Sequence, residues 1–435
     1  MMGMKECVLY RDFAHGEVLE KMTALIAAAE KKQEKTEQNK EDFYGCVNQL
    51  VEMAGLYGFS GNLWHCYLTF LLVNHENAFS RACEIRGEVA GSINELALHD
   101  FTIFKEWYDF DLMVFDRSFD TSCCRILCDY TNTDTNSKMF NKRIRDRICE
   151  MSKTLATAKS TEEFKADMVQ FYKDFGVGKL GLHKAFRVGH DADGEVVIEP
   201  ITRTAHVNLE DLVGYEIPKQ KLIENTEAFV EGRKANNCLL FGDAGTGKSS
   251  SIKGILNKYY DRGLRIIEVY KHQFQDLNDV IAQIKNRNYK FIIYMDDLSF
   301  EEFEIEYKYL KAVIEGGLEK KPDNILIYAT SNRRHLVRER AGDKLEIMDE
   351  DDLHSSDTVQ EKLSLVYRFG VRIYFGAPNK KEFQNIVKTL AQRFGVTMPE
   401  EKLLLEANKW ELSHGGLTGR TAQQFIDHIL GTIEN

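Results

Sequence analysis

The sequence has no apolar run approaching the length of about 18 residues that a membrane span requires. Residues 1–12 carry mixed charge and lack the apolar core of a secretory signal. Aspartate and glutamate (68) outnumber lysine and arginine (57), which gives a formal net charge of −11. This balance disfavours general nucleic-acid binding as the main role, but it does not exclude a local basic patch. We therefore expect a soluble, cytoplasmic protein that does not contact membranes.

Patterns typical of metal sites are also missing. There are nine cysteines, an odd number, and Cys123, Cys124 and Cys128 are close in sequence, but no CxxC pair or histidine cluster accompanies them. Free structural thiols are favoured over a zinc site, and His65 beside Cys66 is favoured as packing. Residues 130–138 are rich in Thr, Asn and Asp but lack the central Gly and terminal Glu of a calcium loop, so we expect a loop without metal.

The remaining sequence divides into parts with different patterns, and we find no internal repeat. Residues 1–183 are predicted to form a mainly helical domain, because Leu68, Leu71, Leu72 and Phe79 recur at near-helical spacing. This domain is a candidate for partner binding. Residues 184–208 are predicted to form a β-hairpin and linker, since an Asp-Gly turn at 193–194 separates two short apolar runs.

From residue 209 to 378 short apolar runs alternate with helical segments, which is typical of a parallel sheet with helices on both faces. The runs at 238–241, 266–270, 291–295, 325–329 and 371–375 predict five strands. Residues 379–435 have no strand signal and are expected to form a small helical lid. The predicted fold class is therefore α/β, with a helical domain before the sheet and a helical lid after it.

Residues 242–249 match the phosphate-binding pattern GxxxxGK[ST] in full. Its glycines allow the backbone amides to surround phosphates, the lysine reaches the β- and γ-phosphates, and the hydroxyl of Ser249 can ligate Mg²⁺. The alternative is a glycine-rich turn with an exposed lysine. An apolar strand before the loop and a helix after it favour the functional interpretation. The predicted ATP-binding residues are Gly242, Asp243, Ala244, Gly245, Thr246, Gly247, Lys248, Ser249 and Ser250.

A pair of acids, Asp296 and Asp297, ends the buried strand predicted at 291–295. A carboxylate at this end of a strand beside the phosphate loop can hold Mg²⁺, which we assign to Asp296. Asp297 is predicted to polarise the attacking water. The alternative is a solvated pair of acids that merely ends the strand.

Taken together, these features resemble the AAA+ ATPases over about residues 209–433. The resemblance implies that Tyr215 borders the adenine, that Asn332 is a sensor-one residue orienting water, and that Arg420 is a sensor-two residue. It also implies that Arg368, in Tyr-Arg-Phe-Gly, is an arginine finger supplied by a neighbouring subunit, with Arg334 and Arg372 as competitors. The segments Asp-Asp-Leu-Ser-Phe at 296–300 and Gly-Arg-Thr-Ala at 419–422 resemble more closely a bacterial ATP-binding family, domain of unknown function 815.

The sequence departs from the commonest AAA+ pattern at Asp297, where glutamate is usual. Aspartate is one methylene shorter, and a displacement of about 1 Å can cost roughly a hundredfold in rate, unless Glu301 or Glu302 substitutes. No aromatic-hydrophobic-Gly pore loop is evident, and core packing accounts for Tyr270 and Phe274 at least as well. Asn-Lys-Lys-Glu at 379–382 approaches a guanine signature only superficially, so ATP is predicted.

Two functions follow from these patterns. The first is an oligomeric ATPase that uses ATP and Mg²⁺ to remodel a protein or nucleoprotein partner. The second is an ATP-dependent switch or loader with little intrinsic hydrolysis, which Asp297 and the missing pore loop favour. A basic stretch at 333–344, with Arg334, Arg338 and Arg340, precedes an acidic stretch at 346–352. We interpret it as a self-complementary loop in preference to a nucleic-acid contact.

Overall fold

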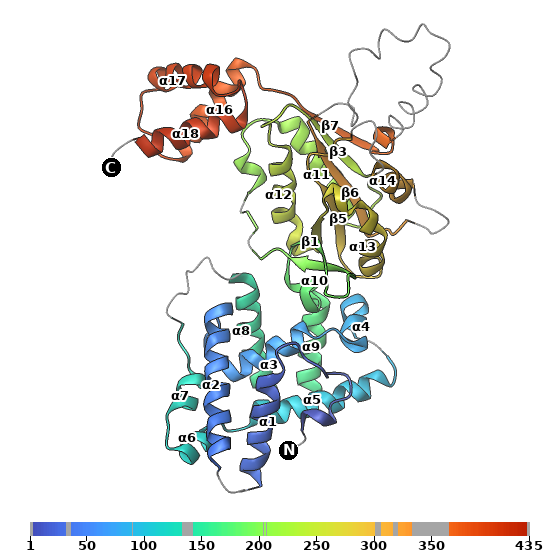
Figure 1. Cartoon of the computed structure of the whole chain (residues 1–435), viewed down its shortest axis with the longest axis vertical. Coiled ribbons are helices and arrows are strands. Elements are labelled where there is room, and N and C mark those ends of the chain that lie inside the picture. Colours follow the sequence, from blue (N-terminus) through green and yellow to red (C-terminus); the bar gives the residue numbers. More distant parts are fainter. Residues whose placement is uncertain are drawn as a thin grey trace. The chain divides into compact units, whose positions relative to one another are not determined.

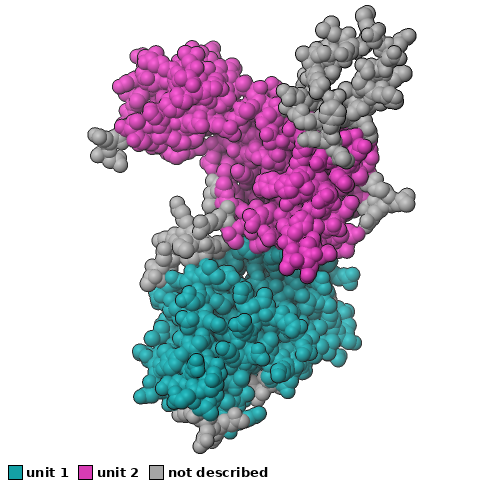
Figure 2. Space-filling view, viewed as in Figure 1, with its two compact units in different colours: residues 1–183 teal, residues 184–435 magenta. Residues whose placement is uncertain are grey.

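The computed structural model describes residues 3–31, 36–88, 90–132, 142–202, 204–205, 207–300, 306–315, 321–332 and 365–432. The chain divides into two compact units, residues 1–183 and 184–435, coloured separately in Figure 2. The first unit is helical, and the second combines a sheet with a group of C-terminal helices (Figure 1). Within the described residues, no helix is both long enough and apolar enough to cross a membrane.

The helical unit is organised around α3 (Leu63–Asn74), which packs against five other helices of the unit. Ten of its twelve residues are buried, from Leu63 to Val73, because the sequence is apolar on every side. The other helices of the unit are α1 (Glu17–Glu30), α2 (Glu37–Tyr57), α4 (Ala78–Arg86), α5 (Ile93–Asp109), α6 (Met113–Phe119), α7 (Cys123–Cys128), α8 (Lys142–Thr157), α9 (Thr161–Phe175) and α10 (Gly178–Leu182), preceded by the short η1 (Met4–Glu6).

One buried carboxylate fixes the N-terminal segment of this unit. Asp100 of α5 is fully buried and accepts hydrogen bonds from the backbone N–H groups of Val8, Leu9 and Tyr10 at 2.7–3.1 Å. A carboxylate removed from water requires such donors. Asp100 therefore ties the first residues of the chain to a helix about ninety residues later in the sequence.

The second unit contains a seven-stranded sheet in the order β2-β1-β4-β5-β6-β3-β7. All neighbouring strands are parallel except β1 and β2. The strands are β1 (Ala185–His190), β2 (Val196–Pro200), β3 (Cys238–Gly242), β4 (Leu264–Glu268), β5 (Lys290–Met295), β6 (Ile325–Ser331) and β7 (Val371–Phe375). The five predicted strands correspond to β3–β7.

The predicted count of five strands omitted the hairpin at residues 184–208, which extends the sheet. β1 pairs in parallel with β4, with Phe186 opposite Ile267, and β2 pairs with β1. Burial of Phe186, Val188 and Ile198 explains why the hairpin packs as part of the sheet. In addition, the side-chain amide of Gln273 donates to the carbonyl of Val188 at 3.0 Å.

Helices cover both faces of this sheet (Figure 1). One face is covered by α11 (Glu216–Val230) and α12 (Lys248–Tyr259), which share a core with the strands through Leu222, Phe229, Ile252 and Ile255. The other face carries α13 (Leu277–Ile284) and α14 (Glu306–Glu315). Short helices η2 (Leu209–Asp211), η3 (Tyr260–Arg262) and η4 (Lys271–Asp276) connect these elements.

Three C-terminal helices form a small bundle with its own core, which we call the lid: α16 (Lys380–Arg393), α17 (Glu400–Ser413) and α18 (Gly419–Thr432). Asn379, which begins the sequence that superficially resembles a guanine signature, caps α16. Its side-chain oxygen accepts hydrogen bonds from the N–H groups of Lys381 and Glu382 at 3.0 Å. The Glu382 carboxylate in turn accepts a hydrogen bond from the Asn379 N–H. These residues therefore start a helix.

Candidate functional site

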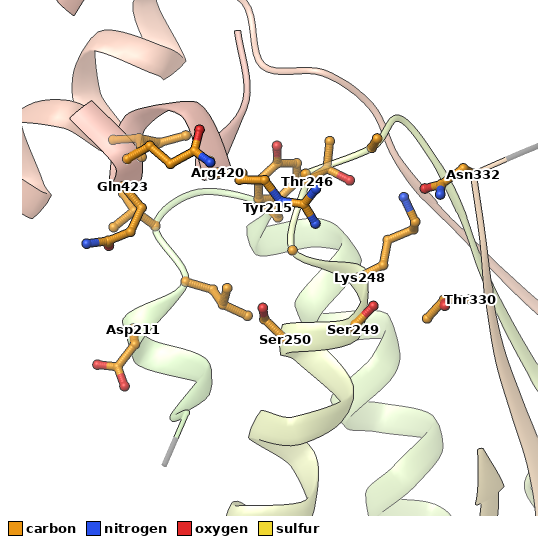
Figure 3. A pocket seen from close by; sticks show the side chains of 18 of the residues that line it. Asp211, Tyr215, Thr246, Lys248, Ser249, Ser250, Thr330, Asn332, Arg420 and Gln423 are labelled. Carbon is orange, nitrogen blue, oxygen red and sulfur yellow. The ribbon is translucent and has the colours of Figure 1, made fainter. Parts of the chain in front are cut away.

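A cavity of about 600 Å³ lies where the loop between β3 and α12 meets the carboxyl ends of β5 and β6 (Figure 3). The segment 211–215 and the lid helices α16 and α18 complete its walls. In α/β sheets this edge is where ligands bind, because the loops at the strand ends diverge there. Of the predicted site residues, the structure brings Tyr215, residues 244–250, Asp296, Asp297, Asn332 and Arg420 to this cavity.

The loop requires glycine at positions where the chain turns sharply or is approached closely. Gly242 has φ +136°, and a Cβ there would lie 2.1 Å from the carbonyl oxygen of Phe375. Gly245 has φ +76°, and a Cβ there would lie 3.0 Å from Thr418 Oγ1 and 3.2 Å from Arg420 Cβ. No other residue adopts these conformations without strain. The glycines thus allow the loop to contact both the edge strand β7 and the lid.

Lys248 is held inside the loop. Its side-chain nitrogen donates to the carbonyl oxygens of Gly242 at 3.0 Å and Asp243 at 2.6 Å, and the residue is 6% exposed. Burial lowers the pKa of Lys248, although the charges of Asp243, Asp297 and Asp296 act in the opposite direction. The cation is therefore placed, already largely desolvated, at the start of a helix whose N-terminal end favours anions.

Three hydroxyl groups converge on one oxygen of Asp296. Its Oδ1 accepts from Ser249 Oγ at 2.7 Å, from Tyr294 OH at 2.6 Å and from Thr330 Oγ1 at 2.5 Å. Burial alone would raise the pKa of Asp296, but the hydrogen bonds from Thr330, Tyr294 and Ser249 outweigh it, so the pKa is lowered. The carboxylate remains charged next to the Ser249 hydroxyl.

Asp297 adopts the left-handed conformation, with φ +50°, which aspartate tolerates better than most side chains. Its N–H donates to Thr330 Oγ1 at 2.9 Å, and its Oδ1 accepts from Asn332 Nδ2 at 2.7 Å. The two residues predicted to position water are therefore hydrogen-bonded to each other at the cavity wall.

The lid contacts the glycine-rich loop at residues 242–249 directly. The Arg420 N–H donates to the Gly245 carbonyl at 3.2 Å, and the Arg420 side chain lines the cavity beside Thr246 (Figure 3). Tyr215 lies at another wall, with its ring centroid 5.6 Å from that of Phe375, and burial raises its pKa to about 12. The cavity thus has cationic groups near the loop and an aromatic ring beside it.

Sequence comparison assigns the second unit to a family. Residues 181–433, more than half of the chain, match the model of the family described as "Protein of unknown function (DUF815)". The chain belongs to this family. The match spans the sheet, the glycine-rich loop and the lid. No curated protein matches the sequence.

Comparison with solved structures matches part of the chain to two mutant forms of RuvB from Thermotoga maritima. They are 16% and 17% identical over 52% of this chain, with TM-scores of 0.37 and 0.36. The chain spans 64–65% of the length of these RuvB structures. The FIGL-1 AAA domain in complex with ADP is 16% identical over 53% of this chain and 75% of that chain, with a TM-score of 0.36.

Some predicted site residues of this DUF815 member lie away from the cavity. Asp243 uses its carboxylate to accept from the Ala377 N–H at 2.7 Å. Arg368 pairs with Glu315 of α14 and is not among the described residues that line the cavity. Its competitor Arg372 lies 5.4 Å from the centre of the Tyr367 ring.

Core packing was expected for both Tyr270 and Phe274, but it accounts only for Phe274. Phe274 is 2% exposed, whereas Tyr270 is 48% exposed and follows β4. Arg334, Arg338, Arg340, Glu301, Glu302 and the acidic stretch at 346–352 lie outside the described residues. Within the part of the chain that the structure describes, no group of three or more His, Cys, Asp or Glu side chains could hold a metal, and none of the nine cysteines forms a disulfide.

Sequence reasoning did not assign roles to Tyr294 and Thr330. A signal for Tyr294 exists, because residues two apart on a strand point to the same face, and Tyr294 precedes Asp296 by two. Thr330 begins the Thr-Ser-Asn segment that spans the end of β6, in which a role is predicted only for Asn332.

Proposed function

We propose that this protein is an AAA+-type ATPase that binds ATP with Mg²⁺ in the cavity and hydrolyses it to remodel a protein or nucleoprotein partner. The observation that carries this proposal is the convergence of Lys248, Ser249, Asp296, Asp297 and Arg420 on one cavity beside a glycine-rich loop. These side chains supply the cations, carboxylates and metal-binding hydroxyl that phosphoryl transfer to water requires.

The donor set fits magnesium. Ser249 Oγ and Asp296 Oδ1 are 2.7 Å apart, and both are the hard oxygen ligands that Mg²⁺ prefers, with ATP phosphates and water as further ligands. When bound, the metal neutralises charge that develops on the phosphates. Ser249 and Asp296 would hold it, directly or through water.

The remaining residues bind and orient the nucleotide. The loop amides and the N-terminus of α12 face the phosphates, and Lys248 and Arg420 add positive charge. The Tyr215 ring offers an apolar surface for the adenine. The Asp297 carboxylate accepts a hydrogen bond from the attacking water, and Asn332 orients that carboxylate.

Arg368 is proposed to act on the nucleotide of a neighbouring subunit, in a ring or a transient assembly. Its position outside its own cavity is compatible with this role, and Glu315 pairs with it in the single chain. Arginine fingers contribute about 10³–10⁵ in rate in other phosphoryl-transfer enzymes. Turnover per subunit should therefore rise with protein concentration as subunits assemble.

A switch or loader with little hydrolysis is the second candidate. The bond between Asn332 and Asp297 favours it, because the shorter acid is already engaged and its reach toward water is limited. Here ATP binding alone would change the affinity for a partner held by residues 1–183.

Turnover measured against protein concentration separates the two. Hydrolysis that increases with assembly supports the ATPase, whereas ATP binding without turnover at any concentration, with partners added, supports the switch. A pull-down with ATP-loaded Asp297→Asn would trap the partner in either case. Absence of ATP binding by the wild-type chain would contradict both functions.

A further inference from the structure

Tyr294 donates a hydrogen bond to Asp296, an acid that borders the cavity. It lies on β5 and is 5% exposed, and its hydroxyl reaches Asp296 Oδ1 at 2.6 Å. A buried hydroxyl gains most from a charged acceptor, and a carboxylate loses most when such a donor is removed. The pair therefore restricts both side chains to one arrangement.

Thr330 reinforces this arrangement from the adjacent strand. Its hydroxyl donates to Asp296 Oδ1 at 2.5 Å and accepts from the Asp297 N–H at 2.9 Å. One hydroxyl thus connects the backbone of the second acid to the carboxylate of the first. Tyr294 and Thr330 come from strands β5 and β6, which are hydrogen-bonded to each other, so the sheet fixes their spacing.

The three hydroxyls have different positions relative to the cavity. Ser249 belongs to the phosphate loop and, under the proposed function, has a second task as a magnesium ligand. Tyr294 is not a cavity-lining residue among those described, and its hydroxyl approaches Asp296 from the sheet. Its hydrogen bond remains available when Ser249 engages a metal.

We propose that Tyr294 is a positioning residue that, together with Thr330, fixes the Asp296 carboxylate in the orientation needed to hold magnesium with ATP. The inference rests on the proposed function. It assigns to the tyrosine a role in metal-dependent nucleotide binding rather than in core packing alone.

Tyr328 provides a matched control. It lies directly opposite Tyr294 in the register of β5 and β6 and is also buried. Its hydroxyl bonds to Asn225 Nδ2 at 2.9 Å and to Thr226 Oγ1 at 3.0 Å. Tyr328→Phe therefore removes a buried hydroxyl from the same sheet without touching Asp296.

The test measures the affinity for the slowly hydrolysed analogue β,γ-imido-ATP, by calorimetry, in excess Mg²⁺ and in EDTA. For Tyr294→Phe we expect the ratio of the two affinities to fall about tenfold, with the affinity in EDTA unchanged, because a hydrogen bond to a charged group is lost. For Tyr328→Phe the ratio should equal that of wild type. A wild-type ratio in folded Tyr294→Phe overturns the inference.

Thr330 keeps the proposal testable if Tyr294→Phe does not fold. Thr330→Val should lower the Mg²⁺ ratio, and Thr330→Ser, which retains the hydroxyl, should restore it. Equal ratios in both variants overturn the inference. If wild type binds the analogue equally well in Mg²⁺ and EDTA, the magnesium assignment itself fails. If wild type binds no analogue, the proposed function fails.

Discussion

Asp100 in the helical unit and Asp296 in the sheet unit are both carboxylates surrounded by donors, but the donors differ in kind. Asp100 is fully buried and accepts from backbone N–H groups of Val8, Leu9 and Tyr10, whose directions the backbone fixes. The ring of His99 is its one side-chain partner among the contacts described, with Nδ1 3.1 Å from Oδ1. Asp296 borders a cavity and accepts from the rotatable hydroxyls of Ser249, Tyr294 and Thr330.

This difference indicates that Asp100 stabilises the fold, whereas Asp296 can exchange one hydrogen-bond partner for another ligand. Fixed donors give Asp100 a complete environment within its own unit, so its removal affects stability. Hydroxyl donors can rotate, so Asp296 can keep its charge while Ser249 turns to another ligand. Under the proposed function, nucleotide, metal and an arginine of a neighbouring subunit would complete the environment of Asp296 from outside. Three predictions test this contrast.

The largest expected effect concerns Arg368, the arginine proposed to reach the cavity of a neighbouring subunit. Arg368→Ala should leave ATP affinity unchanged but lower turnover of the assembled protein by about 10³-fold, the lower end of the range for arginine fingers. The measurement is steady-state hydrolysis at a concentration where assembly is complete. Arg372→Ala, which changes an arginine of the following strand β7, is the control and should retain activity. Unchanged turnover in Arg368→Ala would move the finger to another arginine.

The second prediction concerns Asp296 itself. Asp296→Asn should lower turnover by at least about 100-fold, because removing one group that stabilises transition-state charge has effects of that order. Its unfolding should remain close to wild type, since the side chain borders a cavity open to water. Calorimetric scans of both proteins without nucleotide make the comparison. A large fall in thermal stability would mean that Asp296, like Asp100, serves the fold.

The third prediction concerns Asp100. Asp100→Ala leaves buried N–H groups without an acceptor and should destabilise the helical unit by about 3 kcal/mol, while ATP binding by the other unit persists. Trp64 and Trp107 are buried in this unit, so their fluorescence during denaturant unfolding reports its stability. Asp109→Ala, an exposed acid on the same helix, is the control. Equal midpoints for the two variants would show that Asp100 is dispensable.

The strands β3–β7 and the position of the glycine-rich loop between β3 and α12 could be predicted, because each is encoded by a contiguous pattern: a short apolar run, or glycines, lysine and serine at fixed spacing. Membership of β1 and β2 in the sheet could not be predicted, since the hairpin's alternation shows that one face is buried but not which strand it joins. The pairing of Phe186 with Ile267 spans 81 residues of sequence and depends on tertiary packing.

The same limit applies to the site. Asp296, Asp297 and Asn332 follow strands and could be placed at one sheet edge from sequence. The contact of Thr330 with Asp296 depends on the register between β5 and β6, which local sequence does not reveal. Tyr294, by contrast, precedes Asp296 by two residues, so its contact could have been inferred from the sequence. Glu315 as partner of Arg368 is likewise set by how α14 packs on the sheet.

Binding of ATP with Mg²⁺ to wild type and to Lys248→Ala is the most direct test of the account. Lys253→Ala, an exposed lysine on the same helix α12, is the matched control. We expect wild type and Lys253→Ala to bind with equal affinity in calorimetry, and Lys248→Ala to show no binding. Undiminished affinity in folded Lys248→Ala would contradict the assignment of residues 242–249 as the phosphate-binding loop.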